Sequence, residues 1–247
     1  MVALGRKFVV VADATALAFA AADRVMARIA DNPGRIAICL TGGSSPRRLY
    51  ELLGQEPYQG RIPWDRVHWF IGDDRFVKPG NPLHNMSMAR GIFLDRCAPA
   101  ANIHPIDTEA HSPYEAARLY EEELQRFYGA LEFDPPQPLF DLVLLGVGPD
   151  GHIASLFPSY PAVEVTDQWV VGVSEAHVEP FVPRVSLTLP TLGSCREMLF
   201  EVGGADKRAI MSRVLEGTDL PANRARSYQG ETVWLCDRDA MPEDHRG

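Results

Sequence analysis

The chain alternates short apolar runs with longer segments in which apolar residues recur at helical spacing. Seven of the runs predict strands, at Phe8–Val11, Ile36–Leu40, Val67–Ile71, Leu142–Val147, Val170–Val173, Met198–Val202 and Val233–Cys236. Ile36–Leu40 and Leu142–Val147 are apolar almost without interruption. Such runs are typical of parallel strands that are covered by helices on both faces of the sheet.

Three segments between the runs predict amphipathic helices. Their apolar positions are Ala18, Ala22, Val25 and Ile29, then Leu49, Leu52 and Leu53, and finally Ala116, Tyr120, Leu124 and Phe127. The sequence Ser-Pro-Tyr-Glu at 112–115 resembles a capping box with proline at the first helical position, so the third helix is expected to begin there. Strands that alternate with helices predict a three-layer α/β fold, with a mainly parallel sheet and helices on both faces.

Composition is that of an ordinary globular protein. Of the 247 residues, 46% are hydrophobic and 23% are charged, which suits one large α/β domain or two small ones. The proline-rich segment 133–138 is the only linker-like stretch, and it is interpreted as a rigid loop before the next strand. We found no internal repeat, and we therefore expect a single domain over residues 1–247.

Charge and cysteine content exclude several classes of function. The formal net charge is -9 and the chain has no block of Lys or Arg, so nucleic-acid and membrane partners are not expected. The four cysteines are far apart, and the histidines have no metal-ligand spacing, so we predict no disulfide, metal or cofactor. No stretch approaches the roughly twenty apolar residues of a membrane span. A cytoplasmic monomer or homodimer is the simplest expectation.

The most informative stretch is 144–158, where an apolar strand runs into the glycine-rich turn Gly-Val-Gly-Pro-Asp-Gly-His. Ligands of α/β sheets bind outside the carboxyl ends of the strands. An imidazole at such a position titrates near neutral pH and serves well as a general base. We therefore expect the chemistry at His152, held by the turn at Asp150 and Gly151.

A second candidate site follows the strand Ile36–Leu40. The segment 41–46, Thr-Gly-Gly-Ser-Ser-Pro, leads directly into a predicted helix at Arg47–Leu53. Glycines allow close backbone approach, and the N–H groups at a helix start suit a phosphate. The P-loop and dinucleotide-binding patterns are both absent. The alternative is a plain turn in which Ser44 or Ser45 caps the helix.

Further polar residues stand at other strand ends. The segment 72–75, Gly-Asp-Asp-Arg, follows the strand Val67–Ile71 and could supply a carboxylate and a cation, with Asn85 in a loop ten residues on. Arg184 precedes an alternating segment, and Lys207 opens a helix after a Gly-Gly turn. The alternatives are a surface ion pair at Asp73–Arg75 and solvated surface charges at the other two positions.

Together these segments resemble the 6-phosphogluconolactonase family, within a wider group that includes glucosamine-6-phosphate deaminase. The resemblance extends over almost the whole chain, and five segments in the same order carry it: 40–46, 72–77, 146–158, 184–190 and 203–207. It implies a modified Rossmann-like fold and hydrolysis of 6-phosphogluconolactone in the oxidative pentose phosphate pathway. The implied partner is a small phosphosugar lactone.

The resemblance also implies roles for individual residues. His152 would be the catalytic base, held by Asp150. The implied substrate- and phosphate-binding residues are Gly42, Gly43, Ser44, Ser45, Asp73, Arg75, Asn85, Gly151, Arg184 and Lys207. The chain departs from the usual pattern at Asp74, where Glu is common, at Ser45, where Thr is common, at His84, where Ser is common, and at Ser159, where Gly is common.

The expected mechanism is direct activation of water. Neutral His152 removes a proton from water, and the resulting hydroxide attacks the lactone carbonyl. The oxyanion would be stabilised by backbone N–H groups near Gly42 and Gly43 or by Arg75, and the sequence does not distinguish these donors.

Two competing hypotheses remain. A deaminase would use Asp73 to move a proton between sugar carbons, but the segment after Asp-Gly-His lacks the Asn-Glu-Pro usual in that group. A non-catalytic sugar-phosphate sensor would keep the anion site, yet no basic DNA-binding segment is present.

Overall fold

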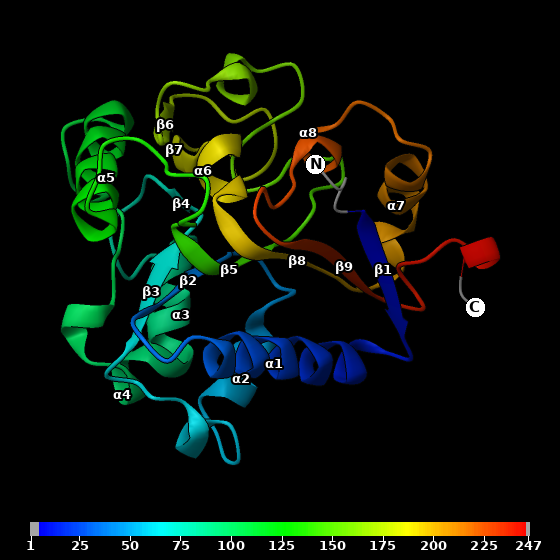
Figure 1. Cartoon of the computed structure of the whole chain (residues 1–247). Coiled ribbons are helices and arrows are strands. Elements are labelled where there is room, and N and C mark those ends of the chain that lie inside the picture. Colours follow the sequence, from blue (N-terminus) through cyan, green and yellow to red (C-terminus); the bar gives the residue numbers. More distant parts are fainter. Residues whose placement is uncertain (1–4, 246–247) are drawn as a thin grey trace.

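A computed structural model describes residues 5–245. Six parallel strands form the main sheet in the order β1-β9-β8-β5-β2-β3 (Figure 1). Their bounds are β1 Arg6–Val11, β2 Ile36–Leu40, β3 Val67–Ile71, β5 Phe140–Leu145, β8 Cys195–Val202 and β9 Glu231–Asp237. A second, antiparallel sheet has the order β4-β7-β6, with β4 at Asp73–Arg75, β6 at Val170–Val173 and β7 at Arg184–Leu187.

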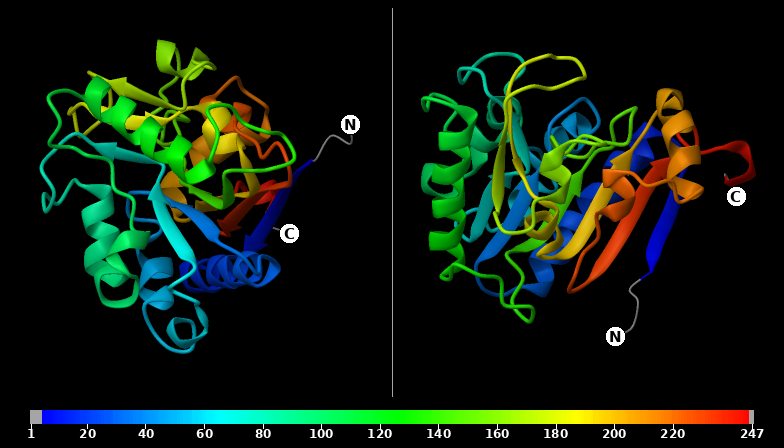
Figure 2. Two further views of the ribbon diagram at one scale, coloured as in Figure 1. Left: turned by 60° about the vertical axis from the view of Figure 1, so that its left-hand side comes forward. Right: turned by 90° about the horizontal axis from the view of Figure 1, so that it is seen from above.

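Helices lie on both faces of the main sheet. The α-helices are α1 Ala14–Asp31, α2 Arg47–Leu53, α3 Asn85–Ala89, α4 Asp95–Cys97, α5 Pro113–Tyr128, α6 Leu189–Gly193, α7 Arg208–Leu215 and α8 Pro221–Arg224. Single turns of other helix types are η1 Gln59–Arg61, η2 Arg90–Leu94, η3 Ala100–Asn102, η4 Pro161–Glu164, η5 Ala205–Lys207 and η6 Glu243–His245. Figures 1 and 2 show α1 and α2 on one face, and α5, α6 and the second sheet over the other.

The predicted α/β fold with a mainly parallel sheet is confirmed. All seven predicted strands are present, although the one placed at Leu142–Val147 is shifted to Phe140–Leu145. The sequence analysis missed β4, because a strand of three charged residues has no apolar alternation. It noted the alternating segment after Arg184 but did not count β7 among the strands. It also placed Asn85 in a loop, and this was wrong because Asn85 is the first residue of α3.

Side-chain caps fix where the long helices begin. The Asp13 carboxylate accepts hydrogen bonds from the N–H groups of Thr15 and Ala16 at the start of α1. At α5 the Ser112 hydroxyl accepts from the Glu115 N–H at 3.1 Å, as the capping-box pattern predicted. The Glu115 carboxylate accepts from the His111 N–H instead of closing the box on Ser112.

The strand order explains where a ligand site can form. The chain leaves β2 toward β3 on one side, whereas it leaves β5 toward β8 on the other. Loops that diverge in this way leave a crevice between the carboxyl ends of two neighbouring strands. Here that point falls between β2 and β5, which pair directly, and the second sheet lies over one face of the main sheet next to them (Figure 1).

Two buried glutamates on β8 differ in how their charge is balanced. Glu197 is 1% exposed and forms ion pairs with Arg24 at 3.1 Å and Arg28 at 3.3 Å, both from α1. Glu201 is 3% exposed, and its Oε2 has no hydrogen-bond partner. Burial raises the pKa of the Glu201 carboxyl to about 8, so this residue is held in the neutral form at neutral pH.

We expect Glu201→Gln to stabilise the protein at alkaline pH. Because the pKa is raised in the folded state, Glu201 lowers stability progressively as pH rises from about 4.5 toward 8. The neutral glutamine removes this loss, so the variant should gain on the order of 3 kcal/mol at pH 8 and much less at pH 5. Urea unfolding at both pH values measures the difference. The exposed Glu132→Gln is the control, and a gain equal at both pH values would contradict the interpretation.

No helix within residues 5–245 is long and apolar enough to cross a membrane.

Candidate active site

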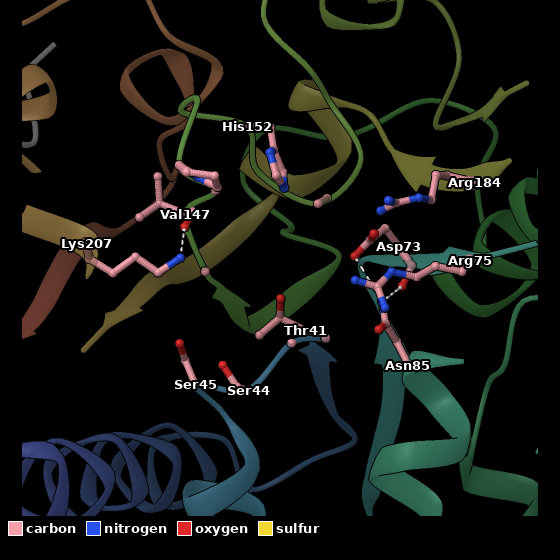
Figure 3. A pocket seen from close by; sticks show the side chains of 16 residues that line it. Thr41, Ser44, Ser45, Asp73, Arg75, Asn85, Val147, His152, Arg184 and Lys207 are labelled. Atoms are coloured by element: carbon pink, nitrogen blue, oxygen red, sulfur yellow. Dashed lines mark hydrogen bonds between the residues drawn. The ribbon is translucent and has the colours of Figure 1, made fainter. Parts of the chain in front are cut away.

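A pocket of about 200 Å³ opens at the carboxyl ends of the central strands (Figure 3). It is lined by Thr41, Gly42, Gly43, Ser44, Ser45, Asp73, Arg75, Asn85, Gly146, Val147, Gly148, Pro149, His152, Ala154, Arg184 and Lys207. These residues come from the loops after β2, β5 and β8, from α3, and from the second sheet. The strand order therefore gathers segments that are far apart in the sequence.

The loop after β2 is anchored by a buried tyrosine. The Tyr50 hydroxyl, from α2, accepts a hydrogen bond from the Thr41 N–H at 3.0 Å and donates one to the Thr41 carbonyl at 2.7 Å. The N-cap residue of α2 is Pro46, and no side chain caps the helix. Ser44 and Ser45 therefore do not cap α2, and both line the pocket (Figure 3).

Asp73 and Asn85 form the opposite wall. The Asp73 side chain is almost fully buried, and its Oδ2 accepts a hydrogen bond from the Ser155 hydroxyl at 2.7 Å. The Asn85 amide donates to the Asp73 carbonyl at 3.0 Å. A Cβ atom at position 42 would lie 2.1 Å from the Asn85 Oδ1, so glycine is required where this loop passes Asn85.

Two arginines lie opposite each other in the wall of the pocket. Arg75 and Arg184 lie directly opposite each other in the pairing of β4 with β7, and like charges in this position repel. Arg184 is 2% exposed and donates to the carbonyl oxygens of Pro180 at 2.8 Å and Val182 at 3.3 Å. Burial lowers the pKa of Arg184, the Asp73 carboxylate opposes this shift, and Arg75 adds to it. An anion in the pocket would relieve the repulsion between the guanidinium groups.

His152 is fixed by a tight turn after β5. The Gly148 N–H donates to the His152 carbonyl at 2.8 Å, and the Gly151 N–H donates to the Gly148 carbonyl at 3.0 Å. Gly151 has a φ of +95°, which favours glycine. A Cβ atom at position 148 would lie 2.1 Å from the imidazole ring, so the ring packs directly on the glycine backbone.

Asp150 accepts the hydrogen bond that orients this imidazole. The Asp150 Oδ1 lies 2.5 Å from the His152 Nδ1 and also accepts the His152 backbone N–H at 3.1 Å. Burial raises the pKa of the Asp150 carboxyl, but hydrogen bonds and charge from His152 outweigh it, and the pKa is lowered to about 2. Asp150 is therefore ionised at neutral pH and favours a proton on Nδ1, which leaves Nε2 with a free lone pair.

Lys207 reaches the pocket from the end of β8. Its ammonium group donates a hydrogen bond to the Val147 carbonyl at 2.9 Å (Figure 3). An ammonium group has three donors, so the group can bind an anion while this contact persists.

Nearly all the residues proposed from the sequence line one pocket. Asp150 and Gly151 do not line it; they form the turn that holds His152. The sequence analysis included the other lining residues in its motifs but gave them no individual role: Thr41, Gly146, Val147, Gly148, Pro149 and Ala154. It also gave none to Ser155, which donates a hydrogen bond to Asp73. Ala154 has a φ of +46°, unusual for a residue with a side chain, and nothing in the residue type signals it. Among residues 5–245, no three His, Cys, Asp or Glu side chains are grouped to hold a metal ion.

The departures at His84 and Ser159 have structural explanations. The His84 Nδ1 accepts the Ser87 N–H at 3.1 Å and so caps α3, which is the role that serine commonly has at a helix start. Ser159 has a φ of +66°, the left-handed region in which glycine is favoured. His84 and Ser159 therefore both fit the backbone geometry at their positions.

The Asp74 side chain binds backbone N–H groups and does not line the pocket. Its fully buried carboxylate accepts hydrogen bonds from the N–H groups of Arg75, Asn85 and Met86. Burial raises the pKa of Asp74 to about 7, although the N–H donors of Met86 and Asn85 oppose the shift. The carboxylate therefore ties β4 to the start of α3, and this link positions Arg75 and Asn85.

A ligand pocket at the switch point of a parallel sheet is typical of doubly wound α/β proteins. A sequence model of the family "Glucosamine-6-phosphate isomerases/6-phosphogluconolactonase" matches residues 12–234. The chain belongs to this family.

Individual relatives and solved structures agree with this assignment. The chain is 37% identical to a 6-phosphogluconolactonase of Nostoc sp. over 95% of this chain and 96% of that protein. It is 38% identical to a 6-phosphogluconolactonase of Synechocystis sp., with 88% of each chain covered. The solved 6-phosphogluconolactonase of Thermotoga maritima has a TM-score of 0.80 and 27% identity over 94% of this chain and 100% of that one.

We expect Gly148→Ala to abolish most activity without unfolding the protein. The added methyl group would overlap the His152 ring and displace it from Asp150. The rate should fall about 10²-fold or more, because misplacing a reacting group by about 1 Å costs that much. Gly91→Ala is the control, since a Cβ atom there meets no atom within 4 Å. Full activity in Gly148→Ala would show that the ring position is not required.

Proposed function

We propose that this protein hydrolyses 6-phospho-D-glucono-1,5-lactone to 6-phosphogluconate. The observation that carries the proposal is the ionised Asp150 paired with His152 beside a pocket that holds three cationic side chains. Membership of the family supports it, as do the curated relatives named 6-phosphogluconolactonase.

The proposed reaction needs one general base and no covalent intermediate. The His152 Nε2 removes a proton from water, and the water oxygen forms a bond to C1 of the lactone. The bond between C1 and the ring oxygen then breaks, and the imidazolium returns its proton to that oxygen. General-base help of this kind contributes about 10²–10⁴-fold.

The cations and the β2 loop are proposed to bind the phosphate. Gly42, Gly43, Ser44 and Ser45 offer backbone N–H groups and hydroxyls, with Lys207 on the same side of the pocket (Figure 3). Arg75 and Arg184 supply a second set of donors next to Asp73. A carboxylate repels phosphate, so we assign Asp73 and Asn85 to the sugar hydroxyls. The oxyanion donor is assigned to Arg75 or to the N–H groups near Gly42 and Gly43.

Lactone hydrolysis tests the proposal directly. The substrate is generated from glucose 6-phosphate, and ammonia release from glucosamine 6-phosphate is measured in parallel. We expect hydrolysis above the spontaneous rate and no ammonia. His152→Ala should lower the rate about 10²–10⁴-fold.

The control for His152→Ala is His111→Gln, at an exposed histidine that directly precedes the N-cap residue of α5. Ammonia without lactone hydrolysis would assign Asp73 as the base and identify a deaminase. Binding of 6-phosphogluconate without either activity would identify a sensor. Near wild-type turnover in His152→Ala would refute the assigned base.

A phosphorylated and an unphosphorylated lactone separate anchoring from chemistry. We expect Lys207→Ala to lower kcat/KM for the 6-phospho lactone about 10–100-fold, as for loss of a hydrogen bond to a charged group. The value for glucono-1,5-lactone should change less than about threefold. Equal losses for the two lactones would exclude Lys207 as a phosphate ligand.

A further inference from the structure

The loop between β6 and β7, residues 174–183, carries a histidine that the sequence analysis gave no role. Figure 2 shows this loop on the same side of the main sheet as the loops that follow β2 and β5. The side chain of His177 is 39% exposed, and its Nε2 lies 3.2 Å from the Asp150 Oδ2. The loop therefore contacts the residue that orients His152.

The two oxygens of Asp150 are divided between two histidines. Oδ1 pairs with the His152 Nδ1, whereas Oδ2 pairs with His177. A carboxylate bonded through one oxygen can still rotate about its Cβ–Cγ bond. A second hydrogen bond through the other oxygen fixes the plane of the group, and with it the direction in which the imidazole of His152 points.

Aromatic packing holds the His177 ring in place. The ring meets Phe157 edge-on with centroids 5.0 Å apart, and it lies at 4.9 Å from the ring of Tyr160. Phe157 also contacts the His152 ring, at 5.0 Å between centroids. Although His177 is partly exposed, its ring is therefore positioned by the same aromatic residue that supports His152.

The same loop also supports the buried arginine. The carbonyl oxygens of Pro180 and Val182 accept hydrogen bonds from Arg184, and the Arg184 guanidinium lies 5.7 Å from the centre of the Phe157 ring. One ten-residue segment thus contacts both the Asp150–His152 pair and a cation of the pocket.

We propose that His177 is a positioning residue, which donates a hydrogen bond to Asp150 and fixes the carboxylate that orients His152. This proposal rests on the proposed lactonase function, because the oriented imidazole is the base of that reaction. The role differs from that of a catalytic residue, since His177 does not line the pocket.

The test uses two variants of the full-length protein. His177→Phe keeps an aromatic ring but removes the donor, and His177→Gln keeps an N–H donor that does not titrate. We expect His177→Phe to lower kcat for lactone hydrolysis about 3–10-fold, with KM within about twofold of wild type, as for loss of one partly exposed hydrogen bond. His177→Gln should recover most of the loss. His111→Gln, at the exposed histidine, is the matched control.

A second measurement does not depend on turnover. The ring ¹⁵N and N–H signals of His152 are followed by NMR at one fixed pH. In His177→Phe they should shift or broaden, because the Asp150 carboxylate is then held through one oxygen only and can rotate, and in His177→Gln they should stay close to those of the wild type. This difference is expected whether or not the lactone is the substrate, so failure of the proposed function and failure of this proposal are distinguishable. If His177→Phe does not fold, His177→Leu, which also lacks the donor, takes its place.

An unchanged kcat in His177→Phe together with unchanged His152 signals would overturn the proposal. A loss of kcat that His177→Gln does not recover, with unchanged His152 signals, would also overturn it. That result would assign His177 a role in packing alone.

Discussion

The lateral pairing of β2 with β5 is the constraint on which the site depends. These strands are separated by about a hundred residues, and the pairs Ile38–Leu142 and Cys39–Val143 bring them together in parallel. Because both strands point the same way, the loop after β2 (residues 41–46) and the turn that carries His152 begin at neighbouring strand ends. The second sheet adds Asp73, Arg75 and Arg184, and the antiparallel pairing of β4 with β7 sets the positions of these residues.

Much of the fold was accessible from the sequence because its strands are apolar and its helices are amphipathic. The position of the pocket was also visible, since Gly-Gly-Ser-Ser and Asp-Gly-His stand at strand ends. The second sheet as a unit was not, although its strand β6 was predicted, because β4 consists of three charged residues and is a strand only through its partner β7, more than a hundred residues later. Local propensity contains no information about such a pairing.

The contacts of single side chains were the least predictable part. His177 meets Asp150 from a loop 27 residues away, and no spacing or motif signals that contact. The sequence analysis assigned Asp73 to the site and noted Asp74 only as a departure from the usual pattern; the Asp74 oxygens bind three backbone N–H groups. Strand alternation explains the difference, because neighbouring residues of β4 point to opposite faces of the second sheet.

The opposed arginines have a consequence for the stability of the fold. Arg75 and Arg184 repel each other, the buried Arg184 donates its hydrogen bonds to carbonyl oxygens, and the Asp73 carboxylate offsets part of the repulsion. An anion bound between the two guanidinium groups would offset the rest and so stabilise the folded state. Affinity for the anion and thermal stability are therefore coupled through this pair of arginines.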